Sequence, residues 1–120
     1  MHNQPKIKKT VWVVSDGVPG HFNQSKGVLF ALERDFELEV HWIELTLKQK
    51  FYRRPLTWLL NYKIPKAEKI DQFYQGDALP NARPDIVVGA GGNSAYAIVW
   101  LSKAFGAKNI FCGSLRQLKV

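Results

Sequence analysis

Cysteine is nearly absent from this sequence, and long apolar runs are absent altogether. The only cysteine of the 120 residues is Cys112, so no disulfide can form within the chain. Every apolar stretch is far shorter than the about 20 residues that cross a bilayer, and the polar start of the chain is unlike a secretory signal peptide. We therefore expect a reducing, cytoplasmic location, with attachment to the inner face of a membrane left open.

Acidic residues are also scarce. Lysine and arginine total 17 against 10 aspartates and glutamates, which gives a formal net charge of +7. This excess favours anionic partners: phosphorylated ligands, acidic lipid or nucleic acid. The histidines and the cysteine do not lie at the spacing of metal ligands. No Gly-Lys-Ser/Thr ends a glycine-rich segment, which excludes a Walker A loop. We therefore expect neither a metal nor a cofactor.

The remaining pattern is an alternation of strands and helices within one domain, residues 1–120. Apolar runs predict strands at 9–14, 36–45, 85–88 and 108–112. Helical patterns begin near residue 23, at 55 and near 93, while 71–84 is polar and is interpreted as a loop. The order βαβαβαβ predicts an α/β, Rossmann-like parallel sheet with helices on both faces. In such sheets ligands bind at the carboxyl ends of the strands.

The first expected strand is followed by a glycine-containing segment, residues 15–24. Gly17 and Gly20 allow the backbone to turn sharply and to approach a ligand closely. His21 can accept a proton from a hydroxyl group, or it can simply hydrogen-bond the turn. Asp16 is a second candidate base, and its alternative role is an Asx turn that stabilises the loop. Asn23 is a further ligand-binding candidate and, like the serine two residues later, can cap the following helix.

The segment 89–94 occupies the same kind of position after a later strand. It approximates the dinucleotide-binding fingerprint, but Ser94 stands where that motif has a third glycine or alanine. Its amides can face an anion at the start of the next helix, and Asn93 or Ser94 can cap that helix. Alternatively, the glycines only permit close packing of helix on strand. The ligand-binding candidates here are Gly89, Gly91, Gly92, Asn93 and Ser94.

Both segments carry a resemblance. Residues 11–24, VWVVSDGVPGHFNQ, resemble the start of the mitochondrial-fission protein family, whose bacterial members are regarded as sugar transferases. Residues 84–94, PDIVVGAGGNS, are similar to a second segment of that family. More distantly, both are similar to the two glycine-rich loops of the lipid-linked peptidoglycan N-acetylglucosaminyltransferase. The similar regions, 10–34 and 83–116, cover roughly half of the chain.

The resemblance implies a GT-B architecture, in which a front domain holds the acceptor and a rear domain holds the nucleotide sugar. This chain would be the acceptor-side domain of an enzyme that transfers a sugar from a nucleotide sugar to a lipid-linked or glycolipid acceptor. His21 or Asp16 would deprotonate the acceptor hydroxyl. The dipeptide Val18-Pro19 departs from the small or polar residues usual in the family's first loop. The family's motif falls on Gly17, Gly20, His21, Gly91 and Gly92.

A GT-B enzyme needs a second Rossmann-like domain for its donor, and none is encoded in these residues. We therefore expect an incomplete domain that is inactive alone, or one that covers its open sheet edge by self-association. Two other functions stay open: a non-catalytic adaptor at a membrane, and a small module that binds a phosphorylated ligand.

The middle of the chain, residues 46–67, is basic and aromatic, with six basic residues and no acidic residue. Such a segment is attracted to an anionic membrane surface, and we expect Arg53, Arg54 and Trp58 to contact it. The alternative is a helix that packs its leucines on the sheet and leaves a solvated basic rim. Binding of nucleic acid by stacking is the least favoured of the three interpretations.

Overall fold

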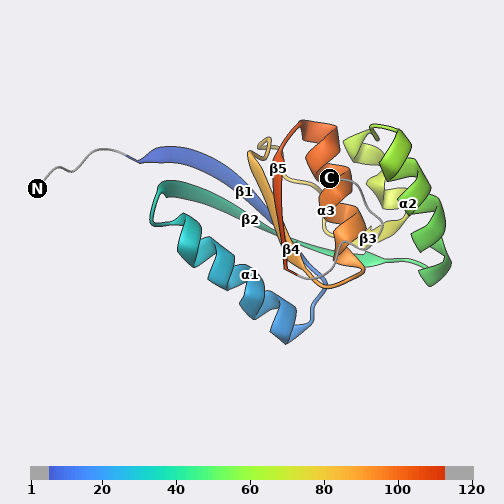
Figure 1. The fold of residues 1–120 in the computed structure, drawn as a ribbon, viewed down its shortest axis with the longest axis horizontal. Helices are drawn as coiled ribbons and strands as arrows, with labels where there is room; N and C mark the ends of the chain where they lie inside the picture. Colours follow the sequence, from blue (N-terminus) through green and yellow to red (C-terminus); the bar gives the residue numbers. More distant parts are fainter. Residues whose placement is uncertain (1–5, 113–120) are drawn as a thin grey trace, which may run out of the picture.

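The computed structural model describes residues 6–112 and shows a sheet between two helical layers (Figure 1). The strands, the helices and two short 3-10 helices follow one another along the chain. Their order is β1 (Ile7–Ser15), α1 (Pro19–Leu32), β2 (Phe36–Leu47), η1 (Lys50–Tyr52), α2 (Arg53–Tyr62), η2 (Ala67–Gln72), β3 (Tyr74–Gly76), β4 (Ile86–Ala90), α3 (Ser94–Phe105) and β5 (Lys108–Cys112).

The strands lie in the order β3-β2-β1-β4-β5. The four long strands are parallel, as the sequence predicts, and Val14 of β1 lies opposite Ile43 of β2 on one side and Gly89 of β4 on the other. The short strand β3 runs antiparallel to β2. The prediction of a loop over 71–84 is therefore wrong in part, because η2 ends and β3 lies within it. Tyr74 is buried there and anchors β3 in the core.

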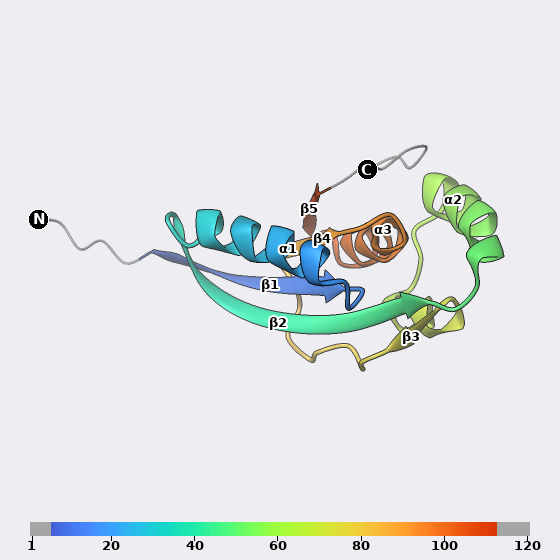
Figure 2. The same ribbon diagram turned by 90° about the horizontal axis from the view of Figure 1, so that it is seen from below.

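Alternate residues of β1 face two separate cores, because successive side chains of a strand point to opposite faces. Val11 and Val13 pack with Leu29 on the α1 side. Trp12 and Val14 pack with α3 and α2 on the other side. Figures 1 and 2 show α1 across one face of the sheet, with α3 and α2 beyond the other. Among the described residues, no helix has the length and apolar character of a bilayer crossing.

Helix starts differ from the prediction, whereas one helix end matches it. Gly106 ends α3 in the left-handed conformation (φ 65°), as expected from the sequence. The helix α1 begins at Pro19, so neither Asn23 nor Ser25 caps it; proline suits the first position because its missing N–H needs no partner there. The helix α2 likewise begins at Arg53, ahead of Pro55.

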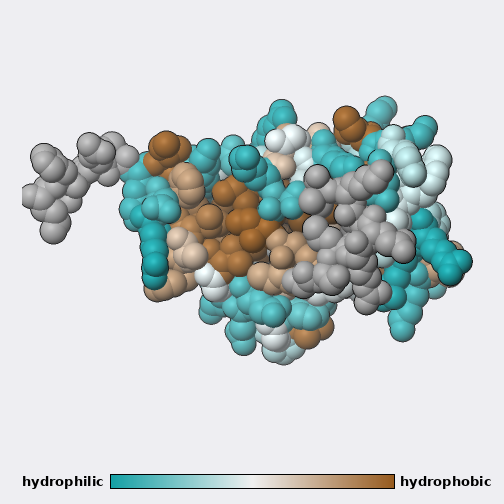
Figure 3. Space-filling view, viewed as in Figure 1, coloured by the Kyte–Doolittle hydropathy of each residue, from teal (hydrophilic) through white to brown (hydrophobic). Residues whose placement is uncertain are grey.

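The α1-side core reaches the surface near β5. Val28 and Leu32 of α1 and Ile110 of β5 are half-buried at its border. The space-filling view shows apolar surface gathered between α1 and β5 (Figure 3). Among residues 6–112, β5 pairs with β4 alone and is thus an edge strand.

Candidate functional site

The two glycine-containing segments meet at the carboxyl edge of the sheet. Because β1 and β4 are parallel neighbours, the chain leaves both strands at the same edge. A Cβ added to Gly91 would lie 2.5 Å from Nδ1 of His21 and 2.7 Å from Oδ2 of Asp16. The prediction that both loops lie on one edge is confirmed, and the loops are in direct contact.

Asp16 and His21 form a hydrogen-bonded pair across the first loop. Oδ2 of Asp16 lies 2.7 Å from Nδ1 of His21. The other carboxylate oxygen, Oδ1, accepts the amide of Val18 at 3.1 Å. This second bond is the Asx turn that the sequence left open as the structural role of Asp16. One carboxylate therefore serves both the turn and the histidine.

The hydrogen bond determines which nitrogen of the His21 ring faces Asp16. Because a carboxylate oxygen can only accept, the neutral ring that keeps this contact carries its proton on Nδ1, which leaves Nε2 as an acceptor. Asp16 is mostly shielded, whereas the His21 side chain keeps a third of its surface exposed. The adjacent Phe22 stacks on Trp42 of β2 with ring centroids 4.6 Å apart, which holds the first turn of α1 over the sheet. The geometry makes His21 the candidate base and Asp16 its positioning residue.

Glycine is required at position 91 for two reasons. Gly91 has φ 96°, a conformation that side chains disfavour, and it touches the Asp16–His21 pair. Gly92 has neither constraint, since nothing lies within 4 Å of the position of its Cβ. Gly89 belongs to β4 and its Cβ would meet Ile98 at 2.5 Å, so it serves the close packing of α3 on the strand. The sequence had left these two roles open for all three glycines.

The rest of the second loop is tied to α2 and β3. Arg53 Nε donates to Oδ1 of Asn93 at 2.9 Å, and the Tyr74 hydroxyl donates to the Asn93 carbonyl. Burial raises the pKa of Tyr74, so this hydroxyl stays protonated and remains a donor. The Asn93 side chain does not cap α3. Within residues 6–112, the amides of Gly92 and Asn93 and the buried hydroxyl of Ser94 have no hydrogen-bond partner.

Charge differs between the two loops. In the first loop the amides of Gly17 and Val18 already bond Ser15 and Asp16, and Oε1 of Glu44 lies 3.2 Å from the position of a Gly17 Cβ. At the second loop, Arg53 of α2 is half-buried, and no carboxylate within the described range lies in ion-pair distance of it. An anion is therefore favoured at the second loop and disfavoured at the first.

Some residues predicted for the site lie elsewhere. Gly20 and Asn23 are exposed residues of α1 and not of the loop. Of the residues expected at a membrane, Arg53 points to the second loop, whereas Arg54 and Trp58 are exposed. The structural contributions of Arg53 and Tyr74 were not predicted. A signal for Tyr74 is the aromatic pair at 73–74 inside a polar segment.

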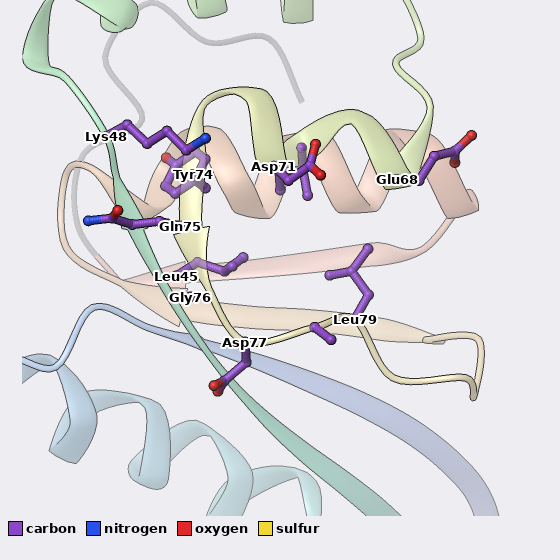
Figure 4. Close-up of a pocket in the computed structure, with 11 residues that line it drawn as sticks. Leu45, Lys48, Glu68, Asp71, Tyr74, Gln75, Gly76, Asp77 and Leu79 are labelled. Carbon is purple, nitrogen blue, oxygen red and sulfur yellow. The ribbon is translucent and has the colours of Figure 1, made fainter.

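A pocket of about 540 Å³ lies beside β3 (Figure 4). Glu68 and Asp71 of η2, Lys48 after β2, and Leu79 contribute to its wall. Tyr74 also lines it, so this side chain separates the pocket from the second loop. None of the residues predicted for a site lines this pocket.

No three histidine, cysteine, aspartate or glutamate side chains within the described part of the chain are arranged to hold a metal ion. Comparison with protein-family models, curated proteins and solved structures finds no match for the chain.

Proposed function

We propose that this chain is the acceptor-side domain of a sugar transferase with a nucleotide-sugar donor and a lipid-linked or glycolipid acceptor. The observation that carries the proposal is the Asp16–His21 pair, held against Gly91 where the two loops meet. A histidine oriented by a carboxylate is a common means of deprotonating a hydroxyl group. The family resemblance of both loops supplies the reaction class.

In the proposed reaction, Nε2 of His21 takes the proton of the acceptor hydroxyl as its oxygen attacks the anomeric carbon. The bond from that carbon to the nucleoside diphosphate breaks, and the diphosphate leaves with the electron pair. Attack from the opposite side inverts the anomeric centre. Asp16 stabilises the imidazolium that forms. In the GT-B arrangement that the resemblance implies, the donor is bound by a second Rossmann-like domain.

The acceptor's phosphate is assigned to the second loop. The amides of Gly92 and Asn93, the positive end of α3 and the charge of Arg53, which has no carboxylate partner among residues 6–112, favour an anion there. The hydroxyl to be glycosylated then lies toward the first loop and His21. This arrangement separates the anion from the carboxylates of Asp16 and Glu44.

Transfer is tested with the protein joined to its donor-binding domain, using a panel of uridine and guanosine diphosphate sugars and a short-chain polyprenyl diphosphate sugar as acceptor. The acceptor site is tested on this chain alone by amide NMR with inorganic diphosphate as the probe. Shifts centred on 91–94 and Arg53 are expected. Shifts centred on 15–18 would overturn the assignment of the anion.

Two alternatives give different results. A phosphate-binding module would bind diphosphate, and no nucleotide sugar would be consumed in the presence of the donor domain. A non-catalytic membrane adaptor would bind vesicles and would show neither diphosphate binding nor transfer. Transfer that depends on His21 excludes both.

A further inference from the structure

The helix α2 has one face in the core and one outside. Leu56 and Leu60 are fully buried against α3, and Lys103 of α3 donates to the carbonyl of Leu60. This is the leucine packing that the sequence offered as the alternative to membrane contact. It accounts for one side of the helix only.

The opposite side carries large apolar groups that the core does not use. Arg54, Trp58 and Tyr62 follow at intervals of four and form one stripe, in which the Trp58 and Tyr62 rings lie 5.9 Å apart. Trp58 is 57% exposed. Phe51 before the helix and Ile64 after it are 69% and 78% exposed. We call these five residues the outer face of α2.

Exposed basic residues accompany these apolar groups along the chain. Arg54 on the stripe and Lys50, Lys63 and Lys66 beside it are all exposed. The sequence has no acidic residue between Glu44 and Glu68. Exposed aromatic and aliphatic groups interleaved with basic residues match the interface of a bilayer that contains anionic lipid.

The position of α2 in the molecule fits a broad, flat partner. Both ribbon views show α2 at one end of the molecule, on the outside of the α3 layer (Figures 1 and 2). A protruding helix can lay its outer face on a bilayer without a clash from the rest of the domain. A nucleic-acid strand is held instead by a groove with stacking platforms, and Ile64 offers no ring for stacking.

We propose that the outer face of α2 docks this domain on the surface of a membrane that contains anionic lipid. Phe51, Trp58 and Ile64 enter the interfacial region, and the lysines and Arg54 meet the lipid headgroups. A second copy of the chain fits less well, since its outer face would bring the same positive charges into contact. The docking does not depend on sugar transfer and holds equally for a non-catalytic domain.

The neighbouring arginines Arg53 and Arg54 lie on different sides of α2, about 100° apart around the helix axis. Arg54 belongs to the outer face, whereas Arg53 reaches Asn93 in the second loop. Since the Arg53 side chain joins α2 directly to Asn93, docking of α2 holds the second loop within about one side-chain length of the docked helix. Under the proposed function, this is the position from which a lipid-linked phosphate reaches Gly92 and Asn93.

The test is co-sedimentation of the full chain with vesicles of phosphatidylcholine and phosphatidylserine in equal amounts, and with phosphatidylcholine alone. Strong binding is expected only to the mixed vesicles, and it weakens as salt increases. Arg54→Gln lowers the partition coefficient about fivefold and Arg54→Gln with Lys63→Gln about 25-fold. The matched control Lys108→Gln removes an exposed charge on β5 and leaves binding unchanged.

A second variant tests the apolar part. Trp58→Ala lowers binding about tenfold, and the deficit persists at high salt because it is not electrostatic. Circular dichroism verifies that each variant is folded. The proposal is overturned if Arg54→Gln and Lys108→Gln bind equally, or if both vesicle types bind alike. It is also overturned if the chain binds single-stranded RNA in place of vesicles, or if Trp58→Ala disrupts a dimer and leaves vesicle binding intact.

Discussion

The chain contains two histidine–carboxylate pairs of similar geometry in different surroundings. Asp16 and His21 lie 2.7 Å apart where two loops meet, and Glu39 and His41 lie 3.0 Å apart on β2. In the first pair the carboxylate holds Nδ1, the partners come from a loop and a helix, and a glycine of another strand's loop closes over them. In the second pair the carboxylate holds Nε2, and the partners are two residues apart on one strand.

The difference shows why distance alone does not identify a site. Residues two apart on a strand share a face, so the Glu39–His41 contact follows from local geometry. The Asp16–His21 pair also needs the Asx turn, the start of α1 at Pro19 and the close approach of Gly91. The arrangement of this pair therefore depends on three separate features of the chain. We therefore place function at the first pair and treat the second as its natural control.

The largest difference is expected on removing each histidine. Under the proposed function, and measured together with the donor-binding domain that this function requires, His21→Ala removes the proposed base and lowers turnover by about 10²-fold or more. His41→Ala, which loses the similar pair on β2, leaves turnover within about twofold, because no proton transfer is assigned to that pair. Steady-state kinetics of both variants measure the difference. Equal losses would remove the distinction between the two pairs.

Replacing the carboxylates Asp16 and Glu39 should give a smaller difference in turnover between the two pairs. Asp16→Asn keeps the shape of the turn but no longer fixes the Nδ1–H tautomer of His21, so turnover falls about tenfold or more. Glu39→Gln is the control and keeps full turnover. If Asp16→Asn is as active as the control, Asp16 serves the turn alone.

The adjacent glycines Gly91 and Gly92 should differ in how much stability is lost when each is replaced by alanine. Gly91→Ala forces a side chain into a left-handed conformation and against the His21 ring, at a cost of about 1–3 kcal/mol in the free energy of unfolding. Gly92→Ala meets nothing within 4 Å and has no positive φ, so it leaves stability nearly unchanged. Urea denaturation of the two variants tests this. Similar midpoints for both would mean that the loops do not touch in solution.

The smallest effect concerns Glu39. The hydrogen bond with His41 holds the pKa of this carboxyl below its ordinary value of 4.5, and Lys8 acts in the same direction. A lowered pKa in the folded state adds stability above pH 4.5, which is lost as the pH falls through the folded value. The contribution is small because the pair is solvent-exposed. Urea midpoints of the wild type and Glu39→Gln should converge below pH 4.5; a constant difference would contradict the shift.

The sequence predicts the frame of this fold well, because buried parallel strands are continuous apolar runs. It predicts β1, β2, β4 and β5, and it predicts that both glycine segments lie at the carboxyl edge. It does not predict the contact of Gly91 with His21, which requires β1 and β4 to be neighbours. The residues of β3 are too few to carry a period. Which of the two arginines, Arg53 or Arg54, reaches the second loop depends on how α2 packs, and the sequence does not distinguish two identical neighbouring residues.

The most direct test of the central claim is the tautomer of His21. Long-range ¹H–¹⁵N correlation spectra of this chain, recorded at a pH where the imidazole rings are neutral, distinguish a protonated Nδ1 from a protonated Nε2. We predict that His21 carries its proton on Nδ1, toward Asp16, with Nε2 free to accept a proton. His41 should show the opposite tautomer, with its proton on Nε2, toward Glu39. A His21 ring protonated on Nε2 would contradict the assignment of this histidine as the base.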